Sequence, residues 1–158
     1  MARATRLILI GPECTGKTTL ARALAATAGV PWVPEAARLF AEAAPAPLSA
    51  ATVDPIARLA IALDDAARAS RADRLVYDTD LVSTAVYARH YYGDCPAWIL
   101  EEAARRLGDR YLLCVPDLPW RADGVRDRGT SRQALFTTFA DTLHAFGARV
   151  ALVGGTGA

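Results

Sequence analysis

The sequence contains a single lysine, Lys17. Lysine and arginine together number 18, so every other residue of this pair is arginine. Its cysteines, Cys14, Cys95 and Cys114, are odd in number and form no CxxC pair, which indicates a reduced, cytoplasmic protein. The apolar run at residues 7–10 is far too short for a membrane span or a signal-peptide core. A formal net charge of +1 gives no electrostatic reason to expect nucleic acid or a membrane as a partner.

The remaining composition is that of a globular domain. The chain has 158 residues, of which 53% are hydrophobic and 22% charged, and this suits one domain over residues 1–158. Strands are predicted at 6–10, 30–33, 74–77, 111–115 and 149–153, and helices at 18–28, 35–43, 52–70, 81–92, 97–107 and 130–146. This alternation predicts an α/β fold, with a parallel sheet covered by helices on both faces.

Helix patterns give finer expectations. Gly29, Gly108 and Gly147 are expected to end helices, and Thr130 with Gln133 fits a capping box. Helix 52–70 is expected to place its i, i+4 pairs, Asp54 with Arg58 and Asp64 with Arg68, on exposed flanks. The buried faces are expected to comprise Val53, Ile56, Ala60, Leu63 and Ala67 in that helix, and Leu135, Phe139, Leu143 and Phe146 in the last one.

Residues 11–18 fit the phosphate-loop pattern G-x-x-x-x-G-K-[ST], between an apolar strand and a helix. Backbone amides and the helix N-terminus of such a loop surround phosphate, the lysine reaches the β- and γ-phosphates, and the hydroxyl of Thr18 ligates Mg²⁺. A planar guanidinium would replace that lysine poorly. The predicted triphosphate-binding residues are Gly11, Glu13, Cys14, Thr15, Gly16, Lys17, Thr18 and Thr19.

The phosphate loop alone does not indicate which reaction the protein catalyses, but the rest of the sequence excludes several classes of phosphate-loop protein. A GTPase carries an Asn-Lys-x-Asp motif, and the sole lysine is already used in the loop. The Leu-Ser-Gly-Gly signature of transporter ATPases is absent, and no helical domain is expected after the core, as a ring-forming ATPase would need. A small-molecule kinase using ATP and Mg²⁺ fits best.

An arginine-bearing segment at about 117–129 is predicted to be a lid over the phosphates. Arg121, Arg126 and Arg128 lie in it, between the fourth strand and the last helix. The alternative is a solvated loop whose charges pair with one another. A lid of this kind would neutralise the transferring phosphoryl group.

Carboxylates follow two of the predicted strands. Asp78 is expected to hold Mg²⁺ or its waters, together with Thr18. Asp80 is expected either to bind substrate or to cap the next helix, and Glu35 either to accept the proton of a substrate hydroxyl or to act as a first-turn helix charge. The aromatic residues Trp32, Trp98, Tyr87, Tyr91 and Tyr92 are candidates for stacking on a base or for the core.

Several segments together resemble the ribosylnicotinamide kinase domain of NadR-type proteins. These are the phosphate loop, residues 34–38 (PEAAR), 78–84 (DTDLVST), and the PDLPW and DGVRD segments at 116–127, and their order matches over nearly the whole chain. The resemblance implies a five-stranded core like that of nucleoside and nucleotide kinases. It also implies ATP-dependent phosphorylation of the 5′-hydroxyl of nicotinamide riboside, giving nicotinamide mononucleotide, with Glu35 as base and Arg126 as the lid arginine.

Trp32, Arg38 and Asp80 are expected to bind the riboside beside Glu35. The family often has an aromatic residue and an acid where this chain has Ala36 and Leu39. No adenylyltransferase domain precedes the kinase segments, so only the kinase step is expected. The rival hypotheses are a kinase for another nucleoside or small metabolite, and a regulatory nucleotide-binding ATPase. The sequence predicts no oligomeric state.

Overall fold

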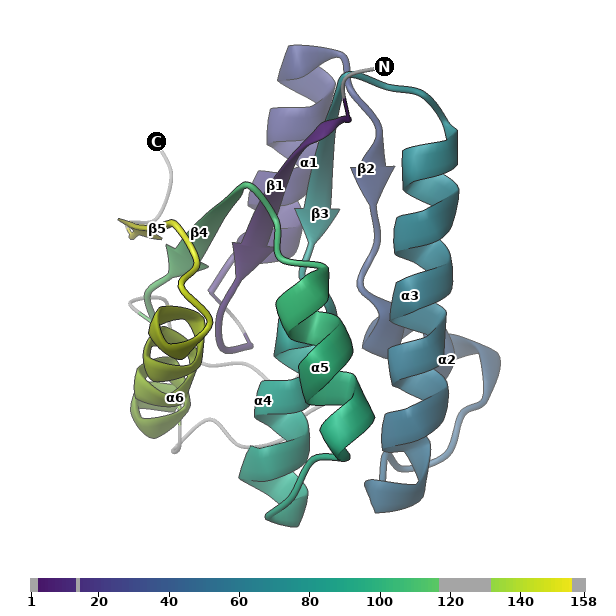
Figure 1. Ribbon diagram of the computed structural model, residues 1–158, viewed down its shortest axis with the longest axis vertical. Coiled ribbons are helices and arrows are strands. Elements are labelled where there is room, and N and C mark those ends of the chain that lie inside the picture. Colours follow the sequence, from purple (N-terminus) through teal and green to yellow (C-terminus); the bar gives the residue numbers. More distant parts are fainter. Residues whose placement is uncertain (1–2, 14, 117–131, 155–158) are drawn as a thin grey trace.

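The computed structural model describes residues 3–13, 15–116 and 132–154 (Figure 1). Within these ranges the strands are β1 Thr5–Ile10, β2 Trp32–Val33, β3 Arg74–Asp78, β4 Arg110–Cys114 and β5 Val150–Val153. The helices are α1 Lys17–Ala28, α2 Ala36–Ala43, the short 3₁₀ helix η1 Ala50–Thr52, α3 Val53–Ala69, α4 Leu81–Tyr92, α5 Ala97–Arg105 and α6 Arg132–Ala145.

All pairings in the five-stranded sheet are parallel, in the order β2-β3-β1-β4-β5. β1 lies at the centre because it pairs with both β3 and β4, and its residues Ile8, Leu9 and Ile10 are fully buried. A continuous apolar strand is what a parallel sheet covered on both faces requires. The predicted five-stranded α/β fold is confirmed.

The helices form one layer on each side of the sheet. α1 lies behind it in Figure 1, where Ala21 and Ala25 pack on Leu9 of β1 and Val76 of β3. The opposite face carries α3, α4, α5 and α6, whose buried side chains share one core with Ile8, Ile10, Leu75 and Tyr77. Neighbouring residues of β1 and β3 therefore face different layers.

Most of the predicted helix details are confirmed. Gly29 ends α1 with φ 65° and its N–H bonded to carbonyls of the last turn, and Gly147 follows α6 with φ 74°. Leu135, Phe139 and Leu143 are fully buried, and the Asp54–Arg58 pair is exposed. α5 ends earlier than predicted, with Arg106 rather than Gly108 as its cap. Thr130 lies outside the described residues.

The expected position of Asp64 is wrong. Its side chain is buried on α3 and accepts hydrogen bonds from Tyr77 of β3 and Arg106, in addition to the predicted partner Arg68. The i, i+4 spacing is typical of a surface pair, but α3 turns this carboxylate toward the sheet. Asp64 therefore belongs to the interior.

The carboxyl ends of β1, β2 and β3 meet at one edge of the sheet, from which the phosphate loop, Glu35 and Asp78 follow. Open α/β sheets bind ligands at this edge. None of the helices in the described ranges is long and apolar enough to cross a membrane.

Candidate active site

The phosphate loop begins where β1 ends and wraps toward the N-terminus of α1. Gly11 has φ 143°, and a Cβ on it would lie 2.8 Å from the carbonyl oxygen of Cys114, so the loop passes against the end of β4. Gly16, at φ 81°, is the N-cap of α1 and offers no side-chain cap, which leaves the helix amides exposed to an anion. This is the backbone arrangement that a phosphate-binding loop needs.

Lys17 is the first residue of α1 and its side chain folds back over the loop. Its Nζ donates to the carbonyl oxygen of Pro12 at 3.4 Å, and the hydroxyl of Thr15 donates to the same oxygen at 2.9 Å. The side chain of Lys17 is buried. The lysine is thus held at the centre of the loop, where it can meet β- and γ-phosphates.

Thr18 and Asp78 offer a pair of oxygen ligands beside the loop. The Thr18 hydroxyl donates to Oδ2 of Asp78 at 2.6 Å, while Oδ1 of Asp78 is buried and has no partner in the described part of the chain. These hard oxygen donors fit Mg²⁺, which keeps several of its waters and needs few protein ligands. No group of three or more acidic, histidine or cysteine side chains in the described ranges could hold a metal by itself.

The acidic residues next to the loop affect one another. Burial raises the pKa of Asp78, and the nearby Glu35 carboxylate raises it further, while Lys17, the Thr18 hydroxyl and Arg38 lower it. Glu35 is 4% exposed, and Arg38 lies beside it with its Nε 3.9 Å from Oε1. The structure thus brings Lys17, Thr18, Glu35, Arg38 and Asp78 together, as expected from the sequence.

Thr79 separates the two aspartates that flank it. It has φ 66°, a left-handed conformation that is strained for a β-branched residue. In a continuing strand Asp78 and Asp80 would point to the same face of the sheet. Instead, Asp78 turns to Thr18 on α1, and Asp80 turns to Tyr111 on β4.

Asp80 is the N-cap of α4, one of the two roles expected from the sequence. Its Oδ1 accepts from the Val82 N–H at 3.0 Å and its Oδ2 from the Tyr111 hydroxyl at 2.5 Å. Burial raises the pKa of Asp80 to about 6, against the lowering effect of these two hydrogen bonds. Both carboxylate oxygens are therefore engaged in holding α4 against β4.

We expect Asp80→Ala to lower the free energy of unfolding by about 2 kcal/mol, because it removes a helix cap and a partner of the Tyr111 hydroxyl. Asp80→Asn keeps an oxygen for Val82 and a polar group for Tyr111, so it should cost less than about 1 kcal/mol. Urea denaturation at neutral pH measures both. Equal losses in the two variants would contradict the capping role.

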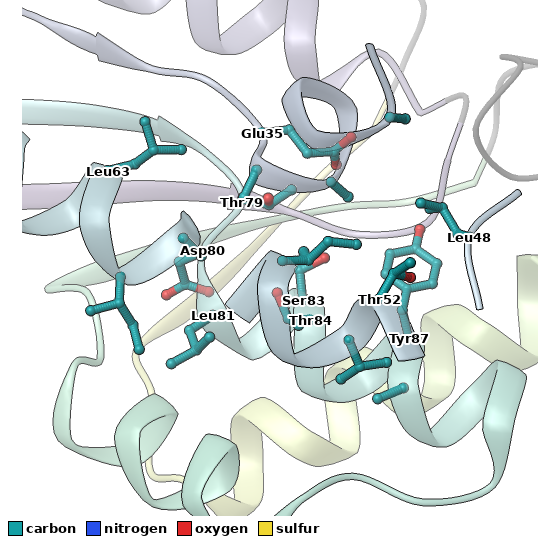
Figure 2. A pocket seen from close by; sticks show the side chains of 18 of the residues that line it. Glu35, Leu48, Thr52, Leu63, Thr79, Asp80, Leu81, Ser83, Thr84 and Tyr87 are labelled. Atoms are coloured by element: carbon teal, nitrogen blue, oxygen red, sulfur yellow. The ribbon is translucent and has the colours of Figure 1, made fainter. Parts of the chain in front are cut away.

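A cavity of about 800 Å³ opens beside this edge, between the ends of β2 and β3 and helices α2, α3 and α4. Figure 2 shows Glu35 and Thr79 on one side of it and Ser83, Thr84 and Tyr87 of α4 on the other. Leu48 and Thr52, from the connection between α2 and α3, also line it. A mostly apolar cavity with a few converging polar groups is typical of small-molecule sites.

Of the aromatic residues predicted to stack on a base or to lie in the core, some line the cavity and others do not. Tyr87, Tyr91 and Tyr92 line the cavity, and Tyr87 stacks on Tyr91 with ring centroids 5.6 Å apart. Trp32 was expected to bind substrate, but it packs on the α1 side of the sheet under the guanidinium of Arg22, 4.9 Å from its ring centroid. Its neighbour Val33 faces the cavity in its place.

Some expected site residues lie outside the described ranges, namely Cys14 and the lid arginines Arg121, Arg126 and Arg128. The sequence did not predict a polar group in the wall of the cavity, where the Asp64 carboxylate accepts hydrogen bonds from Arg6, Tyr77 and Arg106. Two features of the sequence indicate such a group. Arg6 is a charged residue within the apolar strand β1, and Asp64 lies next to a second acid, Asp65.

Known structures share this fold. A crystal structure of NadR protein in complex with NR has a TM-score of 0.79 and 24% identity, covering 98% of this chain and 44% of that one. A NadR structure in complex with NAD and AMP-PNP has a TM-score of 0.78 and 24% identity, with 98% and 45% coverage. Thymidylate kinase from Ehrlichia chaffeensis has a TM-score of 0.66 and 14% identity, with 96% and 93% coverage.

These matches confirm, at the level of the fold, the resemblance predicted from the sequence, and the chain spans less than half the length of the NadR chains. No curated protein sequence matches it. A family described as "AAA domain" matches residues 6–158, which is nearly the whole chain and includes the phosphate loop and the residues that line the cavity. The chain therefore belongs to this AAA domain family, with the fold of phosphate-loop kinases.

Proposed function

We propose that this chain is an ATP-dependent kinase that phosphorylates the 5′-hydroxyl of nicotinamide riboside to give nicotinamide mononucleotide. The observation that carries the proposal is the cavity next to the phosphate loop, with Glu35 in its wall. Its volume of about 800 Å³ suits a nucleoside. The fold shared with the NR complex of NadR supports the choice of acceptor.

In this proposal the residues of the site have separate roles in phosphoryl transfer. The loop amides and Lys17 bind the β- and γ-phosphates, and Lys17 stabilises the charge that develops on the transferring group. The nucleoside lies in the cavity with its hydroxyl directed toward the loop. Glu35, buried beside Arg38 and Asp78, orients that hydroxyl and accepts its proton as the new oxygen–phosphorus bond forms. In the same step the bond between the γ-phosphorus and the oxygen bridging it to the β-phosphate breaks, and ADP leaves.

Thr18 and Asp78 would hold Mg²⁺. When bound, Mg²⁺ neutralises charge on the β- and γ-phosphates. Oδ1 of Asp78, which has no hydrogen-bond partner among the described residues, is the oxygen best placed to accept it or one of its waters. The Arg126 segment is proposed to supply the lid.

We expect Glu35→Gln to lower kcat by about 10²- to 10⁴-fold, because an amide cannot accept the proton, while KM for the nucleoside changes little. Steady-state kinetics with nicotinamide riboside and ATP measures both constants. Glu42→Gln makes the same change at an exposed position of α2 and should leave kcat unaltered. A raised KM with unchanged kcat would make Glu35 a binding residue only.

The acceptor is tested with a panel of nucleosides and small alcohols under saturating ATP. The proposal requires nicotinamide riboside to have the highest kcat/KM. A higher kcat/KM for another nucleoside would support the kinase activity but contradict nicotinamide riboside as its substrate.

Membership of the AAA domain family favours a second candidate, a regulatory ATPase whose nucleotide state sets its conformation. This candidate predicts nucleotide hydrolysis that does not depend on an acceptor and yields no phosphorylated nucleoside. Product analysis by mass spectrometry separates the two.

A further inference from the structure

A hydrogen bond joins the phosphate loop to the wall of the cavity. The Tyr87 hydroxyl, on α4, donates to Oε2 of Glu13 in the loop at 3.0 Å. Figure 2 shows Tyr87 among the side chains that line the cavity. The two sites that a kinase must fill together thus share a direct side-chain contact.

Glu13 is a buried acid within the phosphate loop. It is 1% exposed, and its Oε1 has no hydrogen-bond partner in the described part of the chain. A buried polar atom left without a partner costs about 1–3 kcal/mol. The position of this carboxylate therefore depends strongly on the donor that it does have, Tyr87.

The other side-chain hydrogen bonds that the structure describes for the loop do not reach α4. Those of Thr15 and Lys17 end on Pro12 within the loop, and that of Thr18 ends on Asp78. The hydrogen bond between Tyr87 and Glu13 therefore links α4 to the loop.

We propose that Tyr87 and Glu13 are positioning residues that make the binding of acceptor and triphosphate cooperative. An acceptor packed against the Tyr87 ring fixes the hydroxyl, which holds Glu13 and the loop in the arrangement that receives the triphosphate. By linkage, triphosphate must strengthen acceptor binding by the same factor. This inference rests on the proposed function, since it needs a nucleoside in the cavity and ATP on the loop.

The test is the affinity of the full chain for AMP-PNP with Mg²⁺, measured by calorimetry with and without saturating nicotinamide riboside. In the wild type the riboside should tighten AMP-PNP binding at least about fivefold, the lower end of usual coupling. In Tyr87→Phe the factor should fall below about twofold, while each ligand still binds alone. The variant keeps the ring that stacks on Tyr91 and meets Phe139 edge-on, so the core is preserved.

Two matched changes sharpen the result. Tyr91→Phe removes a hydroxyl from the neighbouring ring in the same cavity and should leave the coupling factor unchanged. Glu13→Gln keeps an oxygen for the Tyr87 hydroxyl and should retain most of the coupling, whereas Glu13→Ala should lose it.

The outcomes separate this inference from the proposed function. If the wild type binds both ligands without cooperativity, or if Tyr87→Phe keeps the full factor, the inference is overturned and the kinase stands. If the wild type binds AMP-PNP but no nucleoside, the proposed function itself fails and the inference fails with it.

Discussion

Lys17→Ala should abolish phosphoryl transfer while leaving the fold intact. Lys17 is the sole lysine of the chain, and it is buried at the centre of the loop with its Nζ on the Pro12 carbonyl. Removing one neutral donor from an oxyanion hole costs about 10²- to 10³-fold in kcat. A cationic donor to a transferring phosphoryl group is worth more, about 10³- to 10⁵-fold. A single long hydrogen bond to Pro12 is a small loss for the fold, so circular dichroism and the unfolding midpoint should stay close to wild type.

The matched control is Arg22→Ala, which removes a positive charge from the same helix. Arg22 covers Trp32 on the far side of the sheet from the cavity, so turnover should change little. Lys17→Arg should be nearly as inactive as Lys17→Ala, because a planar guanidinium does not fit the space of an ammonium. Turnover within about tenfold of wild type in Lys17→Ala would remove the phosphate loop from the mechanism.

The composition allows a second measurement of the same residue. An amine-directed reagent has two possible targets in this chain, the terminal amine and Lys17. Triphosphate bound on the loop should protect Lys17 and leave the terminal amine reactive, which peptide mass spectrometry resolves. Equal labelling of Lys17 with and without ATP would contradict its contact with phosphate.

The sheet and the loop could be predicted because their signals are local. An apolar strand, a glycine-rich turn and an alanine-rich helix follow one another in β1, the loop and α1. The burial of Ile8, Leu9 and Ile10 and the ends of α1 and α4 follow from the same short-range patterns.

The direction of single side chains could not be predicted, because it depends on the backbone and on distant elements. The left-handed backbone of Thr79 turns the Asp80 side chain away from Asp78. No residue type in that segment predicts this conformation, because the segment contains no glycine or asparagine. Trp32 and Val33 alternate across a strand with both faces covered, so the sequence does not say which of them meets the cavity. Asp64 has the spacing of a surface pair, and only the fold brings Arg6 and Tyr77 to it.

Asp64→Asn should cause the largest loss of stability, about 3–5 kcal/mol in the free energy of unfolding, as expected when one partner of a buried ion pair is removed. The Asp64 carboxylate accepts from the Tyr77 hydroxyl at 2.6 Å and faces Arg6 at 3.3 Å, Arg68 at 3.0 Å and Arg106 at 2.9 Å. The side chain of Arg6 is 5% exposed, so it would keep its charge in the interior without this counterion. Urea denaturation at neutral pH measures the loss.

The pH dependence gives a second test of the same carboxylate. Burial alone would raise the pKa of Asp64, but hydrogen bonds from Arg68 and Tyr77 and the charge of Arg6 bring it below its ordinary value. A carboxyl with a lowered folded pKa adds stability above its unfolded pKa, near 4, and loses it as the pH falls through the folded value. The gap between wild type and Asp64→Asn should therefore be full at pH 7 and shrink below about pH 4.

The control for Asp64 is its neighbour in the chain. Asp65 also contacts Arg106, at 2.8 Å, but its side chain is 60% exposed. Asp65→Asn should cost less than about 1 kcal/mol at pH 7, because water replaces an exposed ion pair at little cost. Equal losses at the two positions would mean that the charge of Arg106, rather than the buried group around Arg6 and Tyr77, decides the stability of this side of the sheet.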